Sequence, residues 1–143
     1  MRGFTLIELL VVLALMGLAL TVASPLIANA LPGTELRAAA RDVATGLRYA
    51  RSLAIATNSD VTFDVDVDAR RFAVAQGRRT GSLPEDAEIA LTTARSELFD
   101  TGSGSIRFFP DGTSTGGGVE IARKGRRFVI SVDWLTGRVK ILP

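Results

Sequence analysis

The sequence predicts an α+β fold in which a long N-terminal helix packs by its second half against antiparallel strands. Three patterns lead to this prediction. No charged residue occurs between Leu9 and Thr34 of the 143-residue chain, which indicates a continuous apolar helix. Apolar residues then recur at helical spacing from Leu36 to Ala54. After residue 60 they alternate with polar residues, as in a strand with one buried face.

The first apolar segment has the length of a membrane span. Phe4 to Ala23 comprises 20 residues, which as a helix extend about 30 Å, the thickness of the hydrocarbon core of a bilayer. Pro25 lets the helix bend or end, because proline lacks an amide hydrogen and clashes with the preceding turn. Glu8 is anomalous, because a carboxylate in a spanning helix costs roughly 2.5–3.5 kcal/mol near the bilayer centre. It either lies near enough to the surface to reach water or pairs with a cation in an assembly.

A second, amphipathic helix is predicted from about residue 34 to 57. Thr34 suits its N-cap, Glu35 suits its first turn, and Asn58-Ser59-Asp60 ends it. Its apolar stripe is best explained by packing on a sheet. The arginines lie mainly off the stripe, as on a solvated outer face, with a face for nucleic acid or anionic lipid as the alternative. The stripe is Leu36, Ala40, Val43, Leu47, Ala50 and Ala54, and the arginines are Arg37, Arg41, Arg48 and Arg51.

In the rest of the chain, short apolar runs separated by turn residues predict short strands joined by turns. The clearest alternation runs from Val61 to Val67, and a second strand follows it after a short turn to form a hairpin. Gln76 to Pro84 is expected to be a basic loop. The glycines at 102–104 and 116–118 are expected in ordinary loops, because neither group has the spacing of a phosphate-binding loop. Further strands are expected at 72–75, 89–91, 106–109, 119–122, 128–132 and 139–141, with turns at 110–113, 124–125 and 136–137.

Composition excludes several kinds of site. There are no cysteines and no histidines, which excludes disulfides, thiolate chemistry and the usual nitrogen and sulfur ligands of zinc. The run Asp64-x-Asp66-x-Asp68 lacks the glycine and the final acid of a calcium loop, so the outer face of a strand explains it better. We therefore expect no metal, no cofactor and no catalytic residue.

Two groups of basic residues form a possible contact surface. Arg78 and Arg79 lie in the expected loop, and the second group lies at a predicted hairpin tip. Nucleic acid is not an expected partner, because 17 basic and 15 acidic residues leave a net charge of only +2. Simple exposure of these basic side chains to solvent is a simpler explanation than contact with nucleic acid. The hairpin group comprises Arg123, Lys124, Arg126 and Arg127.

The N-terminal motif resembles that of the type IV prepilins, a family that includes type IV pilins and the pseudopilins of type II secretion. The motif is Gly3-Phe4-Thr5-Leu6-Ile7-Glu8, followed by the apolar run. The resemblance implies that a prepilin peptidase cleaves between Gly3 and Phe4, and that the new amine of Phe4 is N-methylated. It also implies that Glu8 neutralises the Phe4 amine of a neighbouring subunit and so sets the register of assembly. Residues 1–3 would be the leader, which is shorter than is usual for the family.

Three later segments resemble the minor pseudopilin H group, with similar segments in FimT-type minor pilins. They run from Leu47 to Ala54, from Ile106 to Ser114 and from Thr136 to Val139. The resemblance implies a type IV pilin-like fold and a minor pseudopilin of a type II secretion system, which is not an enzyme. Residues 4–30 would form a transmembrane and assembly helix in the inner membrane. Residues 31–143 would form a periplasmic α+β domain.

The resemblance also implies partners. The subunit would enter a short periplasmic filament, near its tip, that drives protein export across the outer membrane. It would contact other pseudopilin subunits, the prepilin peptidase, the inner-membrane assembly platform and membrane lipid. Its β-rich domain would contact other minor pseudopilins or the exported cargo.

Two alternatives stay open. The first is a minor pilin of a type IV pilus, which would bind DNA through its basic loops. The second is a periplasmic enzyme behind a signal peptide, with Ala28-Asn29-Ala30 as the cleavage site before Leu31. That interpretation leaves Glu8 unexplained, and without histidine or cysteine most catalytic triads are excluded. The mass of the mature protein distinguishes a loss of three residues plus a methyl group from a loss of thirty.

Overall fold

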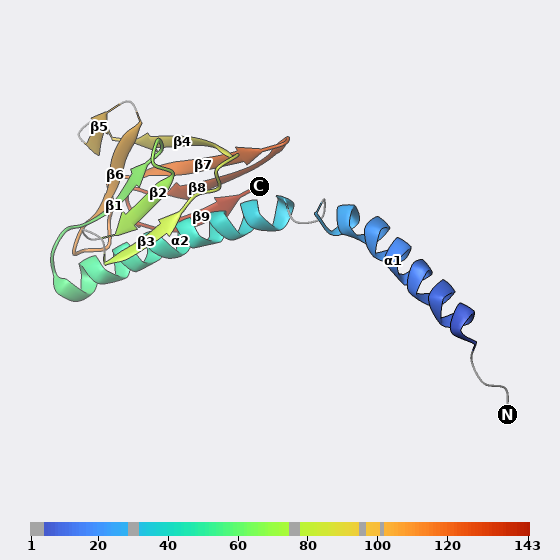
Figure 1. Cartoon of the computed structure of the whole chain (residues 1–143). Helices are drawn as coiled ribbons and strands as arrows, with labels where there is room; N and C mark the ends of the chain where they lie inside the picture. Colours follow the sequence, from blue (N-terminus) through green and yellow to red (C-terminus); the bar gives the residue numbers. More distant parts are fainter. Residues whose placement is uncertain (1–4, 29–31, 75–77, 95–96, 101) are drawn as a thin grey trace. The chain divides into compact units, whose positions relative to one another are not determined.

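The chain divides into two compact units, Met1–Thr34 and Glu35–Pro143. The computed structural model describes residues 5–28, 32–74, 78–94, 97–100 and 102–143, with side chains described outside 19–33 and 98–100. The first unit holds helix α1 (Leu6–Ala28). The second holds most of helix α2 (Pro32–Thr57) and the nine described strands (Figure 1).

Helix α1 exposes apolar side chains around its circumference. Every described apolar side chain from Leu6 to Leu18 is exposed. The helix continues past Pro25 to Ala28, so the proline does not end it. Within the described part of the chain, no helix combines the length and the apolar character that a membrane crossing requires.

Helix α2 buries the predicted stripe, whose six side chains are each at most 1% exposed. It begins at Pro32 rather than at the predicted cap, so Thr34 lies inside its first turn. Proline is well suited to the first helical position, where its missing amide hydrogen has no partner in any case. The helix ends at Thr57 as predicted. Asn58 has a φ of 48°, the left-handed conformation that commonly follows a helix.

Five strands form the first antiparallel sheet, in the order β3-β2-β1-β6-β5. Strands β1 and β2 form the predicted hairpin, in which Phe63 lies opposite Val74. The predicted continuation to Val67 is not part of β1, and Ala75 lies outside the described residues. The bounds are β1 Val61–Asp66, β2 Arg71–Val74, β3 Arg79–Ser82, β5 Leu98–Asp100 and β6 Ser103–Phe108.

Strands β3 and β5 correct the prediction. The expected loop from Gln76 to Pro84 contains β3, which pairs with β2 over four residues. Its side chains are mostly exposed, so it carries no alternation of apolar residues from which a strand could be predicted. Residues 76 and 77 of that expected loop lie outside the described residues. Strand β5 has only three residues, too few to show a period.

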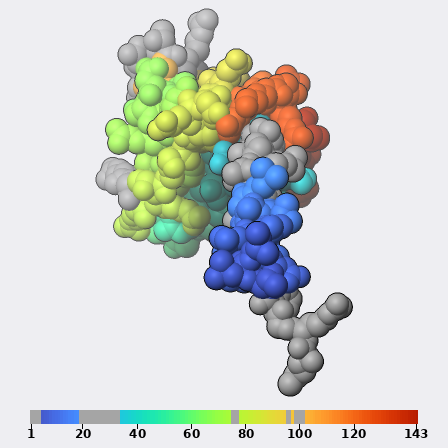
Figure 2. Space-filling view, turned by 45° about the vertical axis from the view of Figure 1, so that its right-hand side comes forward, coloured from blue at the N-terminus to red at the C-terminus, as the bar shows by residue number. Residues whose placement is uncertain are grey.

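Four strands form the second antiparallel sheet, in the order β4-β7-β8-β9. The turn between β7 and β8 is Lys124-Gly125, with φ angles of 48° and 76°, as a tight hairpin turn requires. In the space-filling view, the yellow surface around β4 lies beside the orange surface of β7, its pairing partner (Figure 2). The bounds are β4 Glu88–Thr93, β7 Gly117–Arg123, β8 Arg126–Val132 and β9 Val139–Leu142.

The glycine-rich segments are not loops throughout, contrary to the prediction. Gly104 lies in β6, and Gly117 and Gly118 lie in β7. The reason is close backbone approach, because a Cβ atom at Gly118 would lie 2.7 Å from the carbonyl oxygen of Ile130. Glycine in a strand often marks such an approach.

Both sheets pack on α2 and share one hydrophobic core (Figure 1). The rings of Phe63 and Phe72 stack with centroids 5.1 Å apart. Gly46 makes room for them on α2, because a Cβ there would lie 2.7 Å from the Phe63 ring. The largest fully buried side chains from the two sheets are Phe63, Val74, Ile106, Phe108, Val119, Ile121 and Ile130.

Candidate assembly sites

The N-terminal motif is described in part. The predicted cleavage and methylation positions, Gly3 and Phe4, lie outside the described residues. Glu8 lies in the first turn of α1. Its amide donates hydrogen bonds to the carbonyl oxygen of Thr5 at 3.1 Å and to the Thr5 hydroxyl at 3.3 Å. Thr5 is therefore the N-cap of α1.

This geometry places Glu8 three residues after the N-cap, where a capping box has its acid. Thr5-Leu6-Ile7-Glu8 has the Thr-x-x-Glu spacing of a capping box, a pattern that the sequence interpretation overlooked. An acid in the first turn of a helix is favoured by the helix dipole. A test of the assembly role must therefore separate the charge of Glu8 from its contribution to the helix start.

The predicted basic residues do not form one surface. Arg78 lines a pocket with Leu53 and Thr57, at the end of α2. The guanidinium of Arg79 lies 5.9 Å from the centre of the Tyr49 ring, a cation–π distance. The hairpin group lies elsewhere, since its Arg123 binds Glu35 at the start of α2.

Arg123 is a structural ion-pair centre rather than a solvated tip residue, which corrects the prediction. Its side chain is only 14% exposed, and it bonds Glu35 at 3.0 Å and also Asp86. It therefore connects β7 to α2 and to the turn before β4. Of its neighbours, Arg127 lies 3.7 Å from Glu120 across the hairpin, and Lys124 and Arg126 are exposed.

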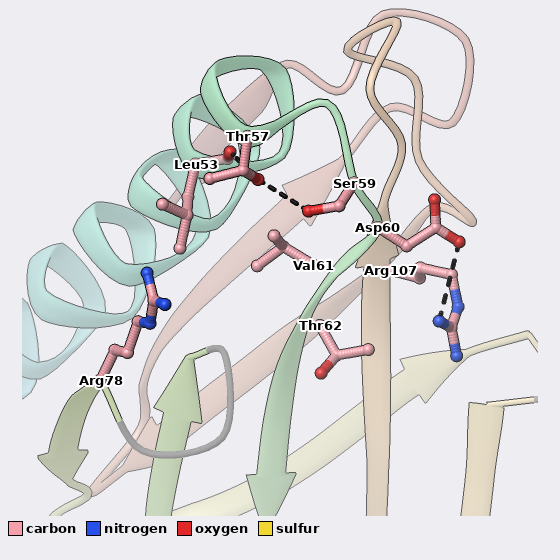
Figure 3. A pocket seen from close by; sticks show the side chains of 8 residues that line it. All are labelled: Leu53, Thr57, Ser59, Asp60, Val61, Thr62, Arg78 and Arg107. Carbon is pink, nitrogen blue, oxygen red and sulfur yellow. Dashed lines mark hydrogen bonds and ion pairs between the residues drawn. The ribbon is translucent and has the colours of Figure 1, made fainter.

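An open pocket of about 380 Å³ lies where α2 ends and β1 begins (Figure 3). Its two arginines, Arg78 and Arg107, lie on opposite sides (Figure 3). Arg107 lies 3.9 Å from Asp60, and the hydroxyls of Thr57 and Ser59 bond each other at 2.7 Å. Most of its polar groups therefore satisfy one another, and they show no nucleophile–base arrangement. Among the described residues, no group of three acids could hold a metal ion.

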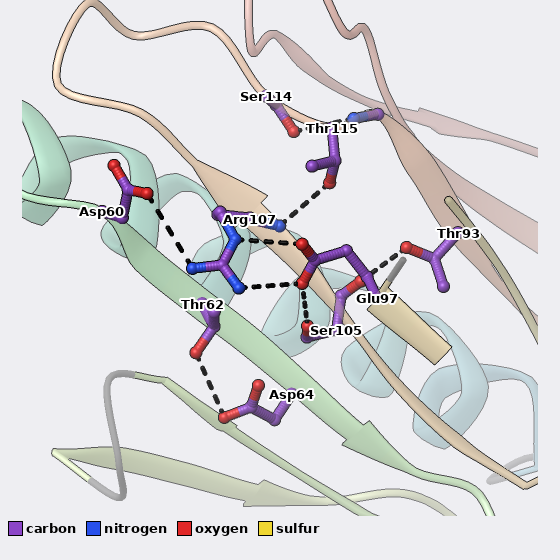
Figure 4. A network of polar contacts seen from close by, with 10 residues as sticks. Asp60, Thr62, Asp64, Thr93, Glu97, Ser105, Arg107, Ser114 and Thr115 are labelled. Atoms are coloured by element: carbon purple, nitrogen blue, oxygen red, sulfur yellow. Dashed lines mark hydrogen bonds and ion pairs between the residues drawn. The ribbon is translucent and has the colours of Figure 1, made fainter. Parts of the chain in front are cut away.

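A buried carboxylate binds two side chains of β6, and the sequence interpretation did not find it. Glu97 is 6% exposed and accepts two hydrogen bonds from Arg107, at 3.0 and 3.2 Å, and one from the Ser105 hydroxyl at 2.7 Å (Figure 4). The Thr93 hydroxyl of β4 donates to the Ser105 carbonyl of β6. The network covers the face of β6 that points away from the core.

The charge of Glu97 is stabilised in place. Burial raises the pKa of this carboxyl, but the hydrogen bonds from Arg107 and Ser105 and the charge of Arg107 together outweigh burial, so the pKa is lowered. The hydrogen bond to Glu97 correspondingly raises the pKa of Arg107. Asp64, on the same sheet face, behaves oppositely, because burial raises its pKa.

The three later segments that resemble the pseudopilin H group meet at one point. Arg51 of α2 donates from Nε to the carbonyl oxygen of Gly112 at 3.0 Å. Gly137 packs on the same carbonyl so closely that a Cβ there would lie 2.2 Å from it. Both glycines are left-handed, with φ angles of 84° and 62°. The helix and the two turns therefore form one junction.

The comparison with known families decides the identity. Residues 39–136 match the family described as "Type II transport protein GspH", and residues 1–24 match the prokaryotic N-terminal methylation motif. The chain belongs to the GspH family. This GspH-family chain is 38% identical to the type II secretion system protein H of Xanthomonas campestris pv. campestris. The match extends over all 143 residues of this chain and covers 84% of that protein.

Solved structures confirm the predicted type IV pilin-like fold of this GspH-family chain. The minor pilin FimU of Pseudomonas aeruginosa matches with a TM-score of 0.59 and 19% identity, over 79% of this chain and 92% of that one. The minor pseudopilin EpsH of Vibrio cholerae matches with a TM-score of 0.59 and 17% identity, over 76% and 95%. At these identities the likeness concerns the fold.

Proposed function

We propose that this chain is a minor pseudopilin of a type II secretion system, incorporated near the tip of the periplasmic filament that drives protein export across the outer membrane. One observation carries the proposal: the same chain matches the methylation motif over residues 1–24 and the GspH family over residues 39–136. The relative named as a secretion protein matches along the whole chain. This favours the secretion system over the type IV pilus.

The proposal includes processing and anchoring. The prepilin peptidase cleaves between Gly3 and Phe4, Phe4 is methylated, residues 4–30 anchor the subunit in the inner membrane, and residues 31–143 lie in the periplasm. The charge-free run from Leu9 to Thr34 supports the anchor. The exposed apolar side chains of α1 also support it, because such a surface requires lipid or neighbouring helices.

Glu8 is proposed to set the register of assembly. Cleavage frees an ammonium group on Phe4, and the Glu8 carboxylate of a neighbouring subunit can neutralise it inside a bundle of apolar helices. Leaving either charge unpaired in such surroundings is strongly unfavourable. The pair therefore selects one axial position for each incoming subunit.

The test separates the charge from the cap. Glu8→Gln removes the charge but keeps a side chain that can complete a capping box, whereas Thr5→Ala removes the cap oxygen and keeps the charge. We expect both variants to be found in the membrane fraction, Glu8→Gln to be absent from sheared filaments and Thr5→Ala to be present. Normal incorporation of Glu8→Gln, or equal loss of both variants from the filaments, would refute the register role.

The remaining partners follow from the same proposal. Other pseudopilin subunits surround α1 and contact the β-rich unit, while the assembly platform, membrane lipid and exported cargo are met during assembly and export. The chain itself is proposed to have a structural role and no enzymatic one. A DNA-binding minor pilin is less well supported, because the basic residues are divided between two places and Arg123 is held by two acids.

A further inference from the structure

Three arginines line a pocket of about 440 Å³ between α2 and the beginning of β9. Arg48 and Arg51 come from α2, and Arg138 comes from the turn that precedes β9. The hydroxyl-bearing residues Ser52 and Thr136 also line it, and no acidic residue does so among the described residues. The pocket is therefore strongly positive and can donate many hydrogen bonds.

In the part of the chain that the structure describes, the positive charges of this pocket are not neutralised by an acidic side chain. Across the described ranges, neither Arg48, Arg51 nor Arg138 takes part in an ion pair, in contrast to Arg107 and Arg123. The acid in the turn before β9, Asp133, is engaged locally, because its carboxylate accepts hydrogen bonds from the Thr136 amide and hydroxyl, both at 2.8 Å.

One of the three arginines that line the pocket is held in place. Arg51 uses its Nε to bind the Gly112 carbonyl oxygen at 3.0 Å, which leaves the two terminal nitrogens of its guanidinium to donate elsewhere. Arg48 stands one helical turn before Arg51 on the same face of α2. A guanidinium fixed in this way loses less conformational freedom when it binds an anion.

Exposed apolar side chains lie beside the pocket. Trp134 is 65% exposed and Leu135 is 59% exposed, in the same turn as Thr136 and Arg138. The side chain of Ile55, also exposed, approaches Gly112, where an added Cβ would lie 3.3 Å from it. Tryptophan and arginine are the residues most enriched at the centres of protein–protein interfaces.

We propose that the pocket of Arg48, Arg51 and Arg138 binds the carboxylates of an acidic segment from a neighbouring protein subunit, whose apolar residues cover Trp134 and Leu135. Carboxylate is the anion that a protein partner supplies, and the arginine fork matches it with two parallel hydrogen bonds. A nucleic acid would require a longer positive track than one pocket in a chain of net charge +2. This inference rests on the proposed function, because it takes the partner to be another subunit.

The test uses the full chain in micelles of an uncharged detergent. The probe is a fluorescent peptide with two adjacent glutamates between leucines, and the comparison probes are its glutamine counterpart, inorganic phosphate and duplex DNA. We expect saturable binding of the acidic peptide, with Arg48→Gln and Arg138→Gln each weakening it about tenfold, since each removes a charge-assisted contact. Arg41→Gln is the matched control, because Arg41 is exposed on the same helix but does not line the pocket.

Each contrary outcome overturns the inference. These outcomes are absent binding of the acidic peptide, equal binding of the glutamine peptide, or an equal loss with Arg41→Gln. If DNA binds more tightly than the acidic peptide, and the same two variants lose that binding, the ligand of the pocket is a nucleic acid rather than an acidic segment. Failure of the proposed function looks different, because it would change the mature N-terminus and filament incorporation of the unaltered chain while leaving peptide binding intact.

Discussion

The two helices differ in where their apolar side chains lie. Helix α1 has apolar residues on all sides, and its described ones are exposed, as with Leu13 at 58%. Helix α2 is much less apolar overall, yet the side chains of its stripe are fully buried under two sheets. Full burial of one leucine side chain contributes about 1.5–3 kcal/mol. The burial of its stripe therefore stabilises α2 within its own chain, whereas the described apolar side chains of α1 are exposed and are proposed to face lipid or other subunits.

The comparison also separates folding from assembly. Every described buried apolar residue lies between Leu36 and Val139, so the unit Glu35–Pro143 contains a complete core. Changes in this unit should alter its own unfolding. Changes in α1 should alter insertion and incorporation, and leave that unfolding as it is.

The largest expected difference comes from the same substitution in the two helices. Leu47→Ala should lower the free energy of unfolding of the Glu35–Pro143 unit by about 2–5 kcal/mol, because it leaves a cavity at a fully buried position. Leu13→Ala should leave that free energy unchanged. Denaturant unfolding of the full chain in micelles, followed by the fluorescence of Trp134, measures both. A comparable loss from Leu13→Ala would contradict the independence of the two regions.

A smaller difference, of about 1–3 kcal/mol between a crowded and an uncrowded glycine, should come from the junction of α2 with the two turns. Gly137→Ala should cost about 1–2 kcal/mol for the left-handed backbone and about 1–3 kcal/mol more for crowding against the Gly112 carbonyl. Gly125→Ala is the control, because Gly125 is also left-handed but has nothing within 4 Å of an added Cβ. Thermal unfolding of the two variants checks the order, and equal melting temperatures would show that the junction is not tightly packed.

The smallest expected effect, and the one that depends on pH, concerns Glu97. Glu97→Gln should cost about 1–3 kcal/mol at neutral pH, because it weakens charge-assisted hydrogen bonds with Arg107. Glu120→Gln, at the more exposed pair with Arg127, should cost under about 1 kcal/mol.

The sign of the pH dependence follows from the lowered pKa of Glu97. Its stabilisation is complete above the ordinary carboxyl pKa of about 4.3 and disappears as the pH falls through the lower value of the folded state. The difference between the unaltered chain and Glu97→Gln should therefore shrink under acidic conditions. A difference that grows on acidification would contradict the network.

Local patterns predicted the elements that bury a repeating face. The stripe of α2 and the alternation of Val61, Phe63 and Val65 were sufficient, because each repeats the period of its secondary structure over several residues. Strand β3 was not predicted, because backbone pairing with β2 holds it in place and its side chains are mostly exposed.

The polar sites depended on tertiary structure to different degrees. The N-terminal motif could be predicted, since it lies within one short run of residues. The Thr-x-x-Glu spacing of its capping box could have been recognised in the same run. Glu97, just before β5, contacts Arg107 of β6 because these two strands pair in the sheet. The pocket of Arg48, Arg51 and Arg138 combines a helix with a turn far along the chain. No spacing in the sequence indicates such a contact.

The mature N-terminus tests the central claim most directly. Mass spectrometry of the native polypeptide, purified from cells that contain the secretion system, should find a chain that begins at Phe4 and carries a methyl group on its amine. A chain that begins at Leu31 would lack both Phe4 and Glu8. That result would contradict the account of α1 as the anchoring and assembly helix.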